Sequence, residues 1–114
     1  MSDCLFCKIV SGDIPGNIVY RDERVTAFRD INPAAPTHIL IVPNQHIDSV
    51  NMLIVDDEPL IGHLFTAAKT IAAQEGVAES GFRLIINTNA NAGQTVFHIH
   101  LHLLGGAPLK LQMG

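Results

Sequence analysis

The amino-acid sequence predicts an α+β fold, with a five-stranded antiparallel sheet, one long helix and one short N-terminal helix. Five segments have the length, apolar content and flanking turn residues of β-strands, and most of them follow one another along the chain. One long segment, between the third and fourth of these strands, instead repeats its apolar residues at helical spacing. Mostly consecutive strands combined with a single long helix are typical of an antiparallel α+β domain.

The N-terminal third contains the short helix and a hairpin. Residues 4–10 place their apolar side chains on one helical face, and the Ser-Gly-Asp run that begins at Ser11 ends this helix. Residues 18–21 and 25–29 flank turn residues and therefore pair as two antiparallel strands. Residues 30–36 form a loop, because each of the two prolines lacks a backbone donor and keeps its predecessor out of the helical region.

The middle of the chain contains the central strand and the long helix. Residues 38–42 are almost continuously aliphatic, which favours a strand in the middle of the sheet. A helix then runs from the acidic residues at Asp56 to about Glu75, ends before Gly76, and covers the sheet. Its apolar positions recur every three or four residues, at Leu60, Ile61, Leu64, Phe65, Ala68, Ile71 and Ala72.

The fifth strand carries three of the six histidines of the chain. It follows a fourth strand at residues 82–87 and a loop of small residues at 88–93. His98, His100 and His102 alternate with aliphatic residues. Because successive side chains of a strand point to opposite faces, the three imidazoles form a ridge on one face while the aliphatic residues are buried on the other. The pattern predicts a strand that carries chemistry.

Length and composition restrict the class of protein. With 114 residues, of which 47% are hydrophobic and 16% charged, residues 1–114 are expected to form one globular domain. A net charge of −4 argues against general binding to nucleic acid or to an anionic membrane, since both require basic patches. No apolar run approaches the ~20 residues of a membrane-spanning helix. Because no secretory signal is present, we expect a cytoplasmic protein.

The two cysteines, Cys4 and Cys7, have the spacing of a metal or redox site. In a cytoplasmic protein, such a role is favoured over a structural disulfide. A thioredoxin-like redox pair is disfavoured because no strand precedes the cysteines. Two reduced cysteines on a small helix remain an alternative.

Several segments together resemble the histidine triad superfamily and, within it, the Hint branch. Residues 98–104 fit the motif His-φ-His-φ-His-φ-φ, in which φ is apolar. Phe6 with Ile9, residues 30–38, Asn87 and residues 93–96 also resemble this branch, so the similarity covers nearly the whole chain. It implies a homodimer whose sheets join across the two-fold axis. It also implies a purine nucleoside phosphoramidase, which hydrolyses P–N bonds of adenosine and guanosine 5′-monophosphoramidates, or aminoacyl adenylates, through a nucleotidyl-histidine intermediate.

Four residues are the expected catalytic set. His100, the central residue of the ridge, is the expected nucleophile, because a neutral imidazole whose other nitrogen donates a hydrogen bond is nucleophilic near pH 7. His102 is expected to contact the phosphate and the departing amine, and the Thr95 hydroxyl to hold the phosphate near the reacting nitrogen. The resemblance implies that His38 lies behind the triad and orients an active imidazole. No catalytic cofactor is expected. His63, on the polar side of the long helix, is predicted to be a solvated surface residue.

The resemblance also implies a pocket for purine nucleoside 5′-monophosphate derivatives. Asp30 is expected to accept the ribose hydroxyl protons, since an ionised carboxylate only accepts hydrogen bonds. The full set of expected nucleotide-binding residues is Leu5, Phe6, Ile9, Phe28, Arg29, Asp30, Ile31, Asn87, Gly93, Gln94, Thr95, Val96, His100 and His102. Without the resemblance, Phe6, Ile9 and Phe28 would be interpreted as core residues and Asp30 as a turn cap.

The resemblance further implies a structural zinc ion held by Cys4, Cys7, His46 and His98. Four protein ligands leave no open position for a metal-activated water. A strand with His-x-His spacing would nevertheless also permit a catalytic zinc. Three functions therefore stay open: a metal-independent nucleotidyl-histidine hydrolase, a zinc-dependent hydrolase, and a nucleotide-binding interaction module with weak or vestigial catalysis.

Overall fold

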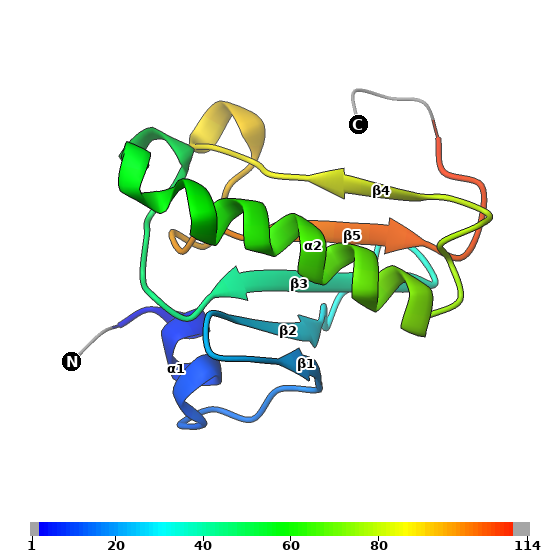
Figure 1. Ribbon diagram of the computed structural model, residues 1–114, viewed down its shortest axis with the longest axis horizontal. Coiled ribbons are helices and arrows are strands. Elements are labelled where there is room, and N and C mark those ends of the chain that lie inside the picture. The colour runs from blue at the N-terminus through cyan, green and yellow to red at the C-terminus, as the bar shows by residue number, and fades with distance from the viewer. Residues whose placement is uncertain (1–2, 111–114) are drawn as a thin grey trace.

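The structure is a computed structural model, and it describes residues 3–110 of the chain. The helices and strands occur in the predicted order: α1 (Leu5–Ser11), β1 (Ile18–Arg21), β2 (Val25–Arg29), β3 (Thr37–Pro43), α2 (Glu58–Gln74), β4 (Phe82–Ile85) and β5 (Leu101–Gly105). Short 3-10 helices lie in the connections: η1 (Val50–Met52), η2 (Val55–Asp57) and η3 (Ala90–Ala92). The predicted α+β class is therefore confirmed (Figure 1).

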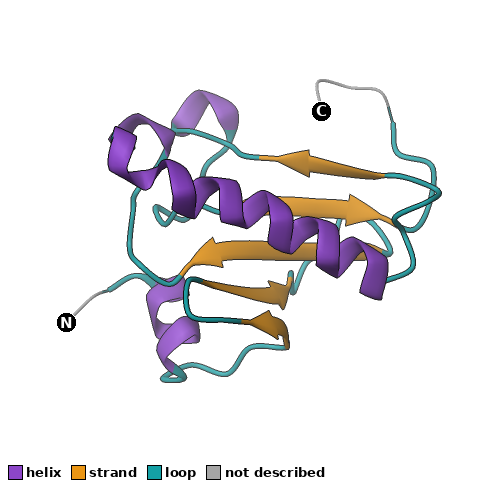
Figure 2. Cartoon of the chain, in the orientation of Figure 1, coloured by secondary structure: helices purple, strands orange, loops and turns teal. Residues whose placement is uncertain are grey.

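The five strands form one sheet in the order β1-β2-β3-β5-β4, and all neighbours are antiparallel. β3 is the central strand, as its aliphatic run predicts: Ile41 faces Ala27 of β2 on one side and Leu101 of β5 on the other. β1 and β4 lie at the two edges. Figure 2 shows α2 lying across one face of this sheet, and α1 near the end where β3 finishes.

The face of the sheet under α2, which we call the helix face, contains the larger core. Leu64, Ala68 and Ile71 of α2 are fully buried against strand residues such as Ile39 and Leu103. Each fully buried leucine or isoleucine contributes about 1.5–3 kcal/mol relative to an exposed one. Gly76 follows the helix with a φ of +74°, a conformation that favours glycine. No helix within residues 3–110 has the length and apolar content needed to cross a membrane.

The opposite face, which we call the histidine face, contains a smaller core beneath α1. Phe6 and Ile9 of α1 pack with Phe28, Leu40 and Val42. Because side chains alternate along a strand, Leu40 and Val42 point to this face while their β3 neighbours point to the helix face. α1 ends at Gly12, which adopts a left-handed conformation with a φ of +87°, as the Ser-Gly-Asp run predicts.

The last two strands are shorter than predicted. β5 begins only at Leu101, so His98 and His100 precede the strand. The reason is that residues 98–100 are held by the loop after β3: the Ile99 N–H donates to the Ile47 carbonyl at 2.7 Å, outside the strand ladder. β4 ends at Ile85, which pairs with His102, the second residue of β5. The predicted alternation of side chains still holds. Ile99 and Leu101 are buried, and the His98 and His100 rings, which alternate with them, contact Phe6 on the histidine face.

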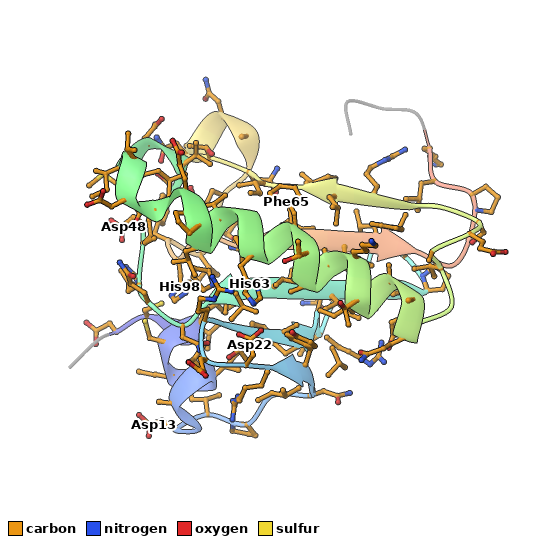
Figure 3. All side chains as sticks on the ribbon, in the orientation of Figure 1. Asp13, Asp22, Asp48, His63, Phe65 and His98 are labelled. Atoms are coloured by element: carbon orange, nitrogen blue, oxygen red, sulfur yellow. The ribbon has the colours of Figure 1, made fainter. Side chains whose placement is uncertain are left out.

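Two predictions for α2 are wrong. Phe65, placed in the apolar stripe, is 44% exposed; Figure 3 shows it on α2. Consecutive helix residues are about 100° apart around the axis, so Phe65 points away from the direction of buried Leu64. His63, predicted to be solvated, has a side chain that is only 19% exposed. Its Nε2 lies 2.7 Å from a carboxylate oxygen of Asp22, in the turn between β1 and β2.

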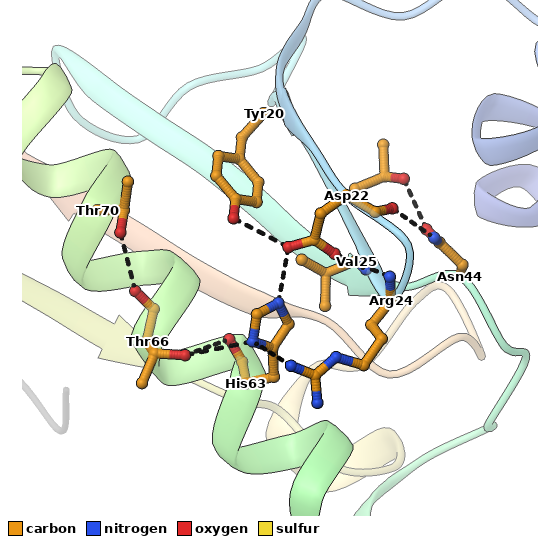
Figure 4. A network of polar contacts seen from close by, with 9 residues as sticks. Tyr20, Asp22, Arg24, Val25, Asn44, His63, Thr66 and Thr70 are labelled. Atoms are coloured by element: carbon orange, nitrogen blue, oxygen red, sulfur yellow. Dashed lines mark hydrogen bonds and ion pairs between the residues drawn. The ribbon is translucent and has the colours of Figure 1, made fainter.

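The Asp22–His63 contact belongs to a network that ties α2 to the hairpin (Figure 4). The Asp22 carboxylate also accepts hydrogen bonds from the Tyr20 hydroxyl and from the backbone N–H groups of Arg24 and Val25, at 2.8–2.9 Å. Burial by itself would raise the pKa of Asp22, but the bonds from His63, Arg24, Val25 and Tyr20 outweigh it and hold that pKa well below its ordinary range.

Candidate active site

The position of the proton on the His100 ring is set by the residue two positions before it. Its Nδ1 lies 2.8 Å from the backbone carbonyl oxygen of His98. Because a carbonyl only accepts hydrogen bonds, Nδ1 carries the proton, and Nε2 of the neutral ring has a free lone pair. Burial lowers the pKa of His100 and so favours this neutral form. The Phe6 ring stands edge-on to the imidazole, with 5.0 Å between ring centroids, and forms an apolar wall.

His102 and His38 adjoin His100 on the histidine face. The His100 and His102 ring centroids are 4.9 Å apart. Behind His102, His38 Nε2 lies 3.0 Å from His102 Nδ1 and 3.5 Å from a carboxylate oxygen of Asp30. Burial, together with His100 and His38, lowers the pKa of His102 to about 4, and burial also lowers the pKa of His38. The structure thus places His38 behind the triad, where its expected role of orienting an imidazole requires it.

A hollow of about 410 Å³ opens between α1 residues and Asp30, within the usual range of about 300–1,000 Å³ for small-molecule sites. Six of the residues expected to bind a nucleotide line it: Leu5, Ile9, Phe28, Arg29, Asp30 and Ile31. Asp30 belongs to both the hollow and the histidine group, and so connects them. Phe6 is 5% exposed and contributes a buried wall behind Phe28, with 5.2 Å between their ring centroids.

The hollow also contains residues that the sequence did not single out: Ile14, Pro15, Gly16, Asn17 and Leu40. The Pro-Gly pair after α1 was the available signal, since it marks a turn that brings α1 back against the hairpin. A Cβ on Gly16 would lie 2.8 Å from a methyl group of Ile9, so this close approach requires glycine.

Arg29 lines this hollow, yet its guanidinium reaches the helix face. Arg29 is opposite Ile39 in the strand pairing, and Ile39 belongs to the core under α2. The guanidinium makes two hydrogen bonds of 2.9 Å to the carboxylate of Glu75, at the end of α2. This pairing raises the pKa of Arg29.

The loop before the triad is held together by its own polar groups. The Gln94 side-chain amide donates to the carbonyls of Asp48 and Val96 and accepts from the Asn89 N–H, at 2.8–3.1 Å. Asn87 donates to the Ala92 carbonyl at 2.9 Å, and Gly93 ends η3 with a φ of +84°. The Asn87 and Gln94 side chains, both expected at the nucleotide, are thus occupied in supporting this loop.

Thr95 lies apart from the hollow beside Asp30. It is exposed and lines a second hollow of about 460 Å³ with Val96, Phe97 and the N-terminal residues Cys4 and Leu5, among others. Leu5 lines both hollows, whereas Val96 packs partly against the core of Phe6. Of the catalytic residues expected from the sequence, His38, His100 and His102 are therefore brought together, and Thr95 is on the neighbouring surface.

The residues expected to bind zinc form a compact group, which we call the Cys/His cluster: Cys4, Cys7, His46 and His98. Their ligand atoms all lie within 4.8 Å of one another. Cys4 Sγ is 3.3 Å from His98 Nδ1, and Cys7 Sγ is 3.3 Å from His46 Nδ1. His98 lies at the end of the sheet near α1, and Asp48 lies at the same end (Figure 3).

Both imidazoles of the Cys/His cluster turn Nδ1 toward the sulfur atoms. His98 Nε2 donates to the Pro43 carbonyl at 2.8 Å, and His46 Nε2 donates to the Asp48 carboxylate at 2.6 Å. A neutral imidazole that donates at Nε2 has a lone pair at Nδ1, so this geometry leaves the Nδ1 atom of each ring available as a metal ligand. Two sulfur and two nitrogen donors form a set that suits tetrahedral zinc.

Comparisons with known proteins show the family of the chain. The HIT domain family matches residues 11–109. The chain is 56% identical, over 107 residues, to the purine nucleoside phosphoramidase of Escherichia coli strain K12, an alignment that covers 94% of this chain and 90% of that protein.

Solved structures extend the agreement to the fold. A HIT family hydrolase from Legionella pneumophila Philadelphia 1 superposes with a TM-score of 0.96 at 48% identity, and the match covers 98% of this chain and 100% of that chain. A histidine triad protein from Clostridium difficile gives a TM-score of 0.95 at 42% identity, with coverages of 98% and 97%.

Proposed function

This chain belongs to the HIT domain family, and we propose that it is a purine nucleoside phosphoramidase that hydrolyses the P–N bond of adenosine and guanosine 5′-monophosphoramidates. The observation that carries the proposal is the state of His100: a neutral imidazole with a free Nε2 lone pair, in a histidine group that Asp30 connects to a hollow of suitable size. The similarity to the Escherichia coli phosphoramidase supports the same chemistry.

In the first step, His100 Nε2 attacks the α-phosphorus and forms a P–N bond to the enzyme. The P–N bond of the substrate breaks, and the amine leaves with its electron pair and takes up one proton from solvent. The Nδ1–H of His100 stays hydrogen-bonded to the His98 carbonyl, which stabilises the positive charge of the nucleotidyl-imidazolium. His102, next to His100, contacts the phosphate and the departing amine.

In the second step, water attacks the same phosphorus and the bond to His100 breaks. The electron pair returns to Nε2, and the water releases one proton, which balances the proton taken up by the amine. The purine lies against Leu5, Ile9 and Phe28, and the ribose hydroxyls donate to Asp30. Every atom that changes bonding is thus on the substrate, on water or on His100.

The decisive experiment follows AMP release from an adenosine 5′-phosphoramidate in the wild type and in His100→Ala. We expect the variant to lose at least about 10³-fold in kcat, because the nucleophile is absent, and to keep its affinity for AMP in calorimetry. His63→Gln is the matched control, since it changes a histidine on the helix face and should keep turnover. Full activity of His100→Ala would refute the nucleophile. A wild type that binds AMP but releases none from the phosphoramidate would be a binding module.

We also propose that the Cys/His cluster holds a structural zinc ion. The support is its donor set, with two sulfur atoms and two Nδ1 atoms within 4.8 Å of one another. Zinc bound there would join α1 to the loop after β3, with no open position for substrate. A reducing compartment such as the cytoplasm would keep both thiols available as ligands.

Metal content and thermal unfolding test the zinc proposal. We expect about one zinc ion per chain in the purified protein, and a lower Tm after chelation or in Cys7→Ser, because the metal connects distant segments. Phosphoramidase turnover of the still folded, zinc-free protein should persist. Loss of turnover without loss of folding would instead favour the zinc-dependent hydrolase. A Tm that is insensitive to chelation would exclude a structural metal.

Finally, we propose a homodimer in which two copies of β4 pair and extend the sheet. In the described part of the chain, β4 pairs on one side only, with β5. An unpaired strand edge is a template for another strand, and Phe82 and Leu84 are only partly buried. Sedimentation velocity should give twice the chain mass of 12.3 kDa. A monomer at micromolar concentration would exclude this assembly.

A further inference from the structure

We infer that the backbone N–H of Ala34 fixes the proton positions of His38 and His102, so that His102 meets the substrate as a hydrogen-bond donor at Nε2. Ala34 is thereby a positioning residue that acts through its main chain. The catalytic meaning of the inference rests on the proposed function. The proton order, by which we mean which ring nitrogen of each histidine carries the proton, follows from the hydrogen bonds of residues 30–38.

The first link is the hydrogen bond from the Ala34 N–H to His38 Nδ1, at 3.0 Å. A backbone N–H can only donate, so His38 Nδ1 accepts and carries no proton. The buried His38 is 8% exposed, and burial lowers its pKa, which favours the neutral ring. In a neutral imidazole with Nδ1 unprotonated, the single proton is on Nε2.

The second link determines which nitrogen of His102 carries the proton. His38 Nε2 lies 3.0 Å from His102 Nδ1, and Asp30 is the more distant acceptor at 3.5 Å. Since His38 Nε2 carries the proton, it donates, and His102 Nδ1 must accept. His102 is also neutral, with a pKa of about 4, so its own proton is on Nε2. One backbone donor therefore orders the protons of two imidazoles.

The result is the opposite of the order in His100, although the two ring centroids are only 4.9 Å apart. His100 donates at Nδ1 to the His98 carbonyl and keeps a lone pair at Nε2, whereas His102 accepts at Nδ1 and presents an N–H. A lone pair attacks phosphorus, and an N–H binds a phosphoryl oxygen or the departing amine. A backbone carbonyl and a backbone N–H thus assign different tasks to identical side chains.

The same hydrogen bond argues against a metal ion at Asp30, His38 and His102. Their potential ligand atoms also lie within 4.8 Å of one another. A metal at His38 Nε2 would require the ring proton to move to Nδ1, where it would point at the Ala34 N–H. The Ala34 contact therefore favours hydrogen bonding along this row of residues over metal binding.

The loop is built to hold this N–H in place. Ala34 follows Pro33, and the proline ring restricts the φ angle of Pro33. The Asp30 N–H donates to the His38 carbonyl at 3.0 Å, and an Asp30 carboxylate oxygen accepts from the Asn32 N–H at 2.8 Å. The Ala34 side chain is exposed, so a change of side chain and a change of main-chain donor can be separated experimentally.

The test combines nitrogen NMR of ¹⁵N-labelled histidine with steady-state kinetics. In the wild type near pH 7, we expect the proton on Nε2 of His38 and of His102, but on Nδ1 of His100. Ala34→Pro, or replacement of Ala34 by lactate so that an ester oxygen stands in place of the N–H, removes the donor. We expect His38 to populate the Nδ1–H form and kcat to fall about tenfold, with KM changed less than about twofold. The ester variant decides if Ala34→Pro does not fold.

Two controls separate this role from general support of the loop. Ala34→Gly keeps the N–H and should keep the wild-type proton order, and the same ester replacement at Ala35 removes a neighbouring N–H instead. A wild type with the proton on His38 Nδ1, or an Ala34 ester with unchanged spectra and kcat, would overturn the inference. Neither result would affect AMP release by the wild type. Conversely, absence of phosphoramidase turnover would refute the proposed function and leave the proton order as it is.

Discussion

The two faces of the sheet use the same strands in different ways. On the helix face, α2 buries aliphatic residues such as Leu64 and Ile71 completely, and shape and area determine the packing. On the histidine face, polar side chains are buried as well, with His98 at 0% and His100 at 7% exposure. Each of these imidazoles has a hydrogen bond to a backbone carbonyl. One face therefore supplies stability, and the other holds neutral imidazoles in defined states.

This difference shows how a small domain can contain a buried polar site and remain stable. Burying a polar group without a partner costs about 1–3 kcal/mol, and in residues 3–110 every fully buried side-chain nitrogen or oxygen has a partner. The partners on the histidine face are mainly backbone groups of loops and strand ends, such as the Ala34 N–H in the loop before β3 and the Pro43 carbonyl at the end of β3. These loops are in turn anchored by strands whose other face packs under α2.

The largest expected effect comes from Leu64→Ala, which breaks the helix face alone. Leu64 is fully buried, so we expect a loss of about 2–5 kcal/mol in the free energy of unfolding, from lost burial and the cavity left behind. Urea unfolding measures this loss, and kcat of the folded fraction should change less than twofold. Phe65→Ala, on the exposed side of the same helix, is the control and should cost below about 1 kcal/mol. Equal costs would contradict the assignment of the two sides of α2.

The helix face was predictable because its signals are local. The strands at residues 18–21 and 25–29 begin and end where turn residues predict, and α2 begins and ends within two residues of its predicted limits. Apolar spacing gives the buried positions of a helix directly, with Phe65 as the exception. That exception arose because a run of two apolar residues, Leu64 and Phe65, does not say which one faces the sheet.

The histidine face was predictable only in part, because its contacts join residues far apart in sequence. Period-two spacing predicted that His98, His100 and His102 share a face, but not that β5 starts at Leu101. That start depends on the Ile99–Ile47 bond, whose residues are 52 positions apart. Gln94 and Arg29 were expected at the nucleotide from the family resemblance, yet their side chains bond to the Asp48 carbonyl and to Glu75. Residue type shows what a side chain can do, and the fold decides where it does so.

Asp22→Asn sharpens the comparison, because the Asp22 network is a polar site built for stability. The charged carboxylate accepts from His63, Tyr20 and two backbone N–H groups, so its loss should cost about 2 kcal/mol in urea unfolding at pH 7. Turnover of the folded enzyme should be unchanged. Asp13→Asn, a charge-matched change of an exposed aspartate, should cost below about 0.5 kcal/mol.

The Asp22 effect should also depend on pH. In the folded chain the pKa of Asp22 lies below its ordinary value of 3.8, so the folded state favours the ionised carboxylate. The stability that this carboxylate contributes is fully present above about pH 5, and it is lost as pH falls below 3.8 toward the folded pKa. The stability difference between wild type and Asp22→Asn should therefore shrink in acid. A difference that grows below pH 4 would contradict the lowered pKa.

The smallest expected effect concerns Arg29, the residue that belongs to both faces. It lines the hollow beside Asp30, while its guanidinium pairs with Glu75 beside α2. The Arg29 side chain is 39% exposed, and ion pairs with that degree of exposure contribute about 1 kcal/mol or less. Glu75→Gln should therefore lower the free energy of unfolding by at most that amount, and less at high salt. AMP affinity, measured by calorimetry, should change less than twofold, as it should in the charge-matched control Glu79→Gln. A large loss of AMP affinity in Glu75→Gln alone would mean that the ion pair also shapes the hollow beside Asp30, and that the two faces are coupled through Arg29.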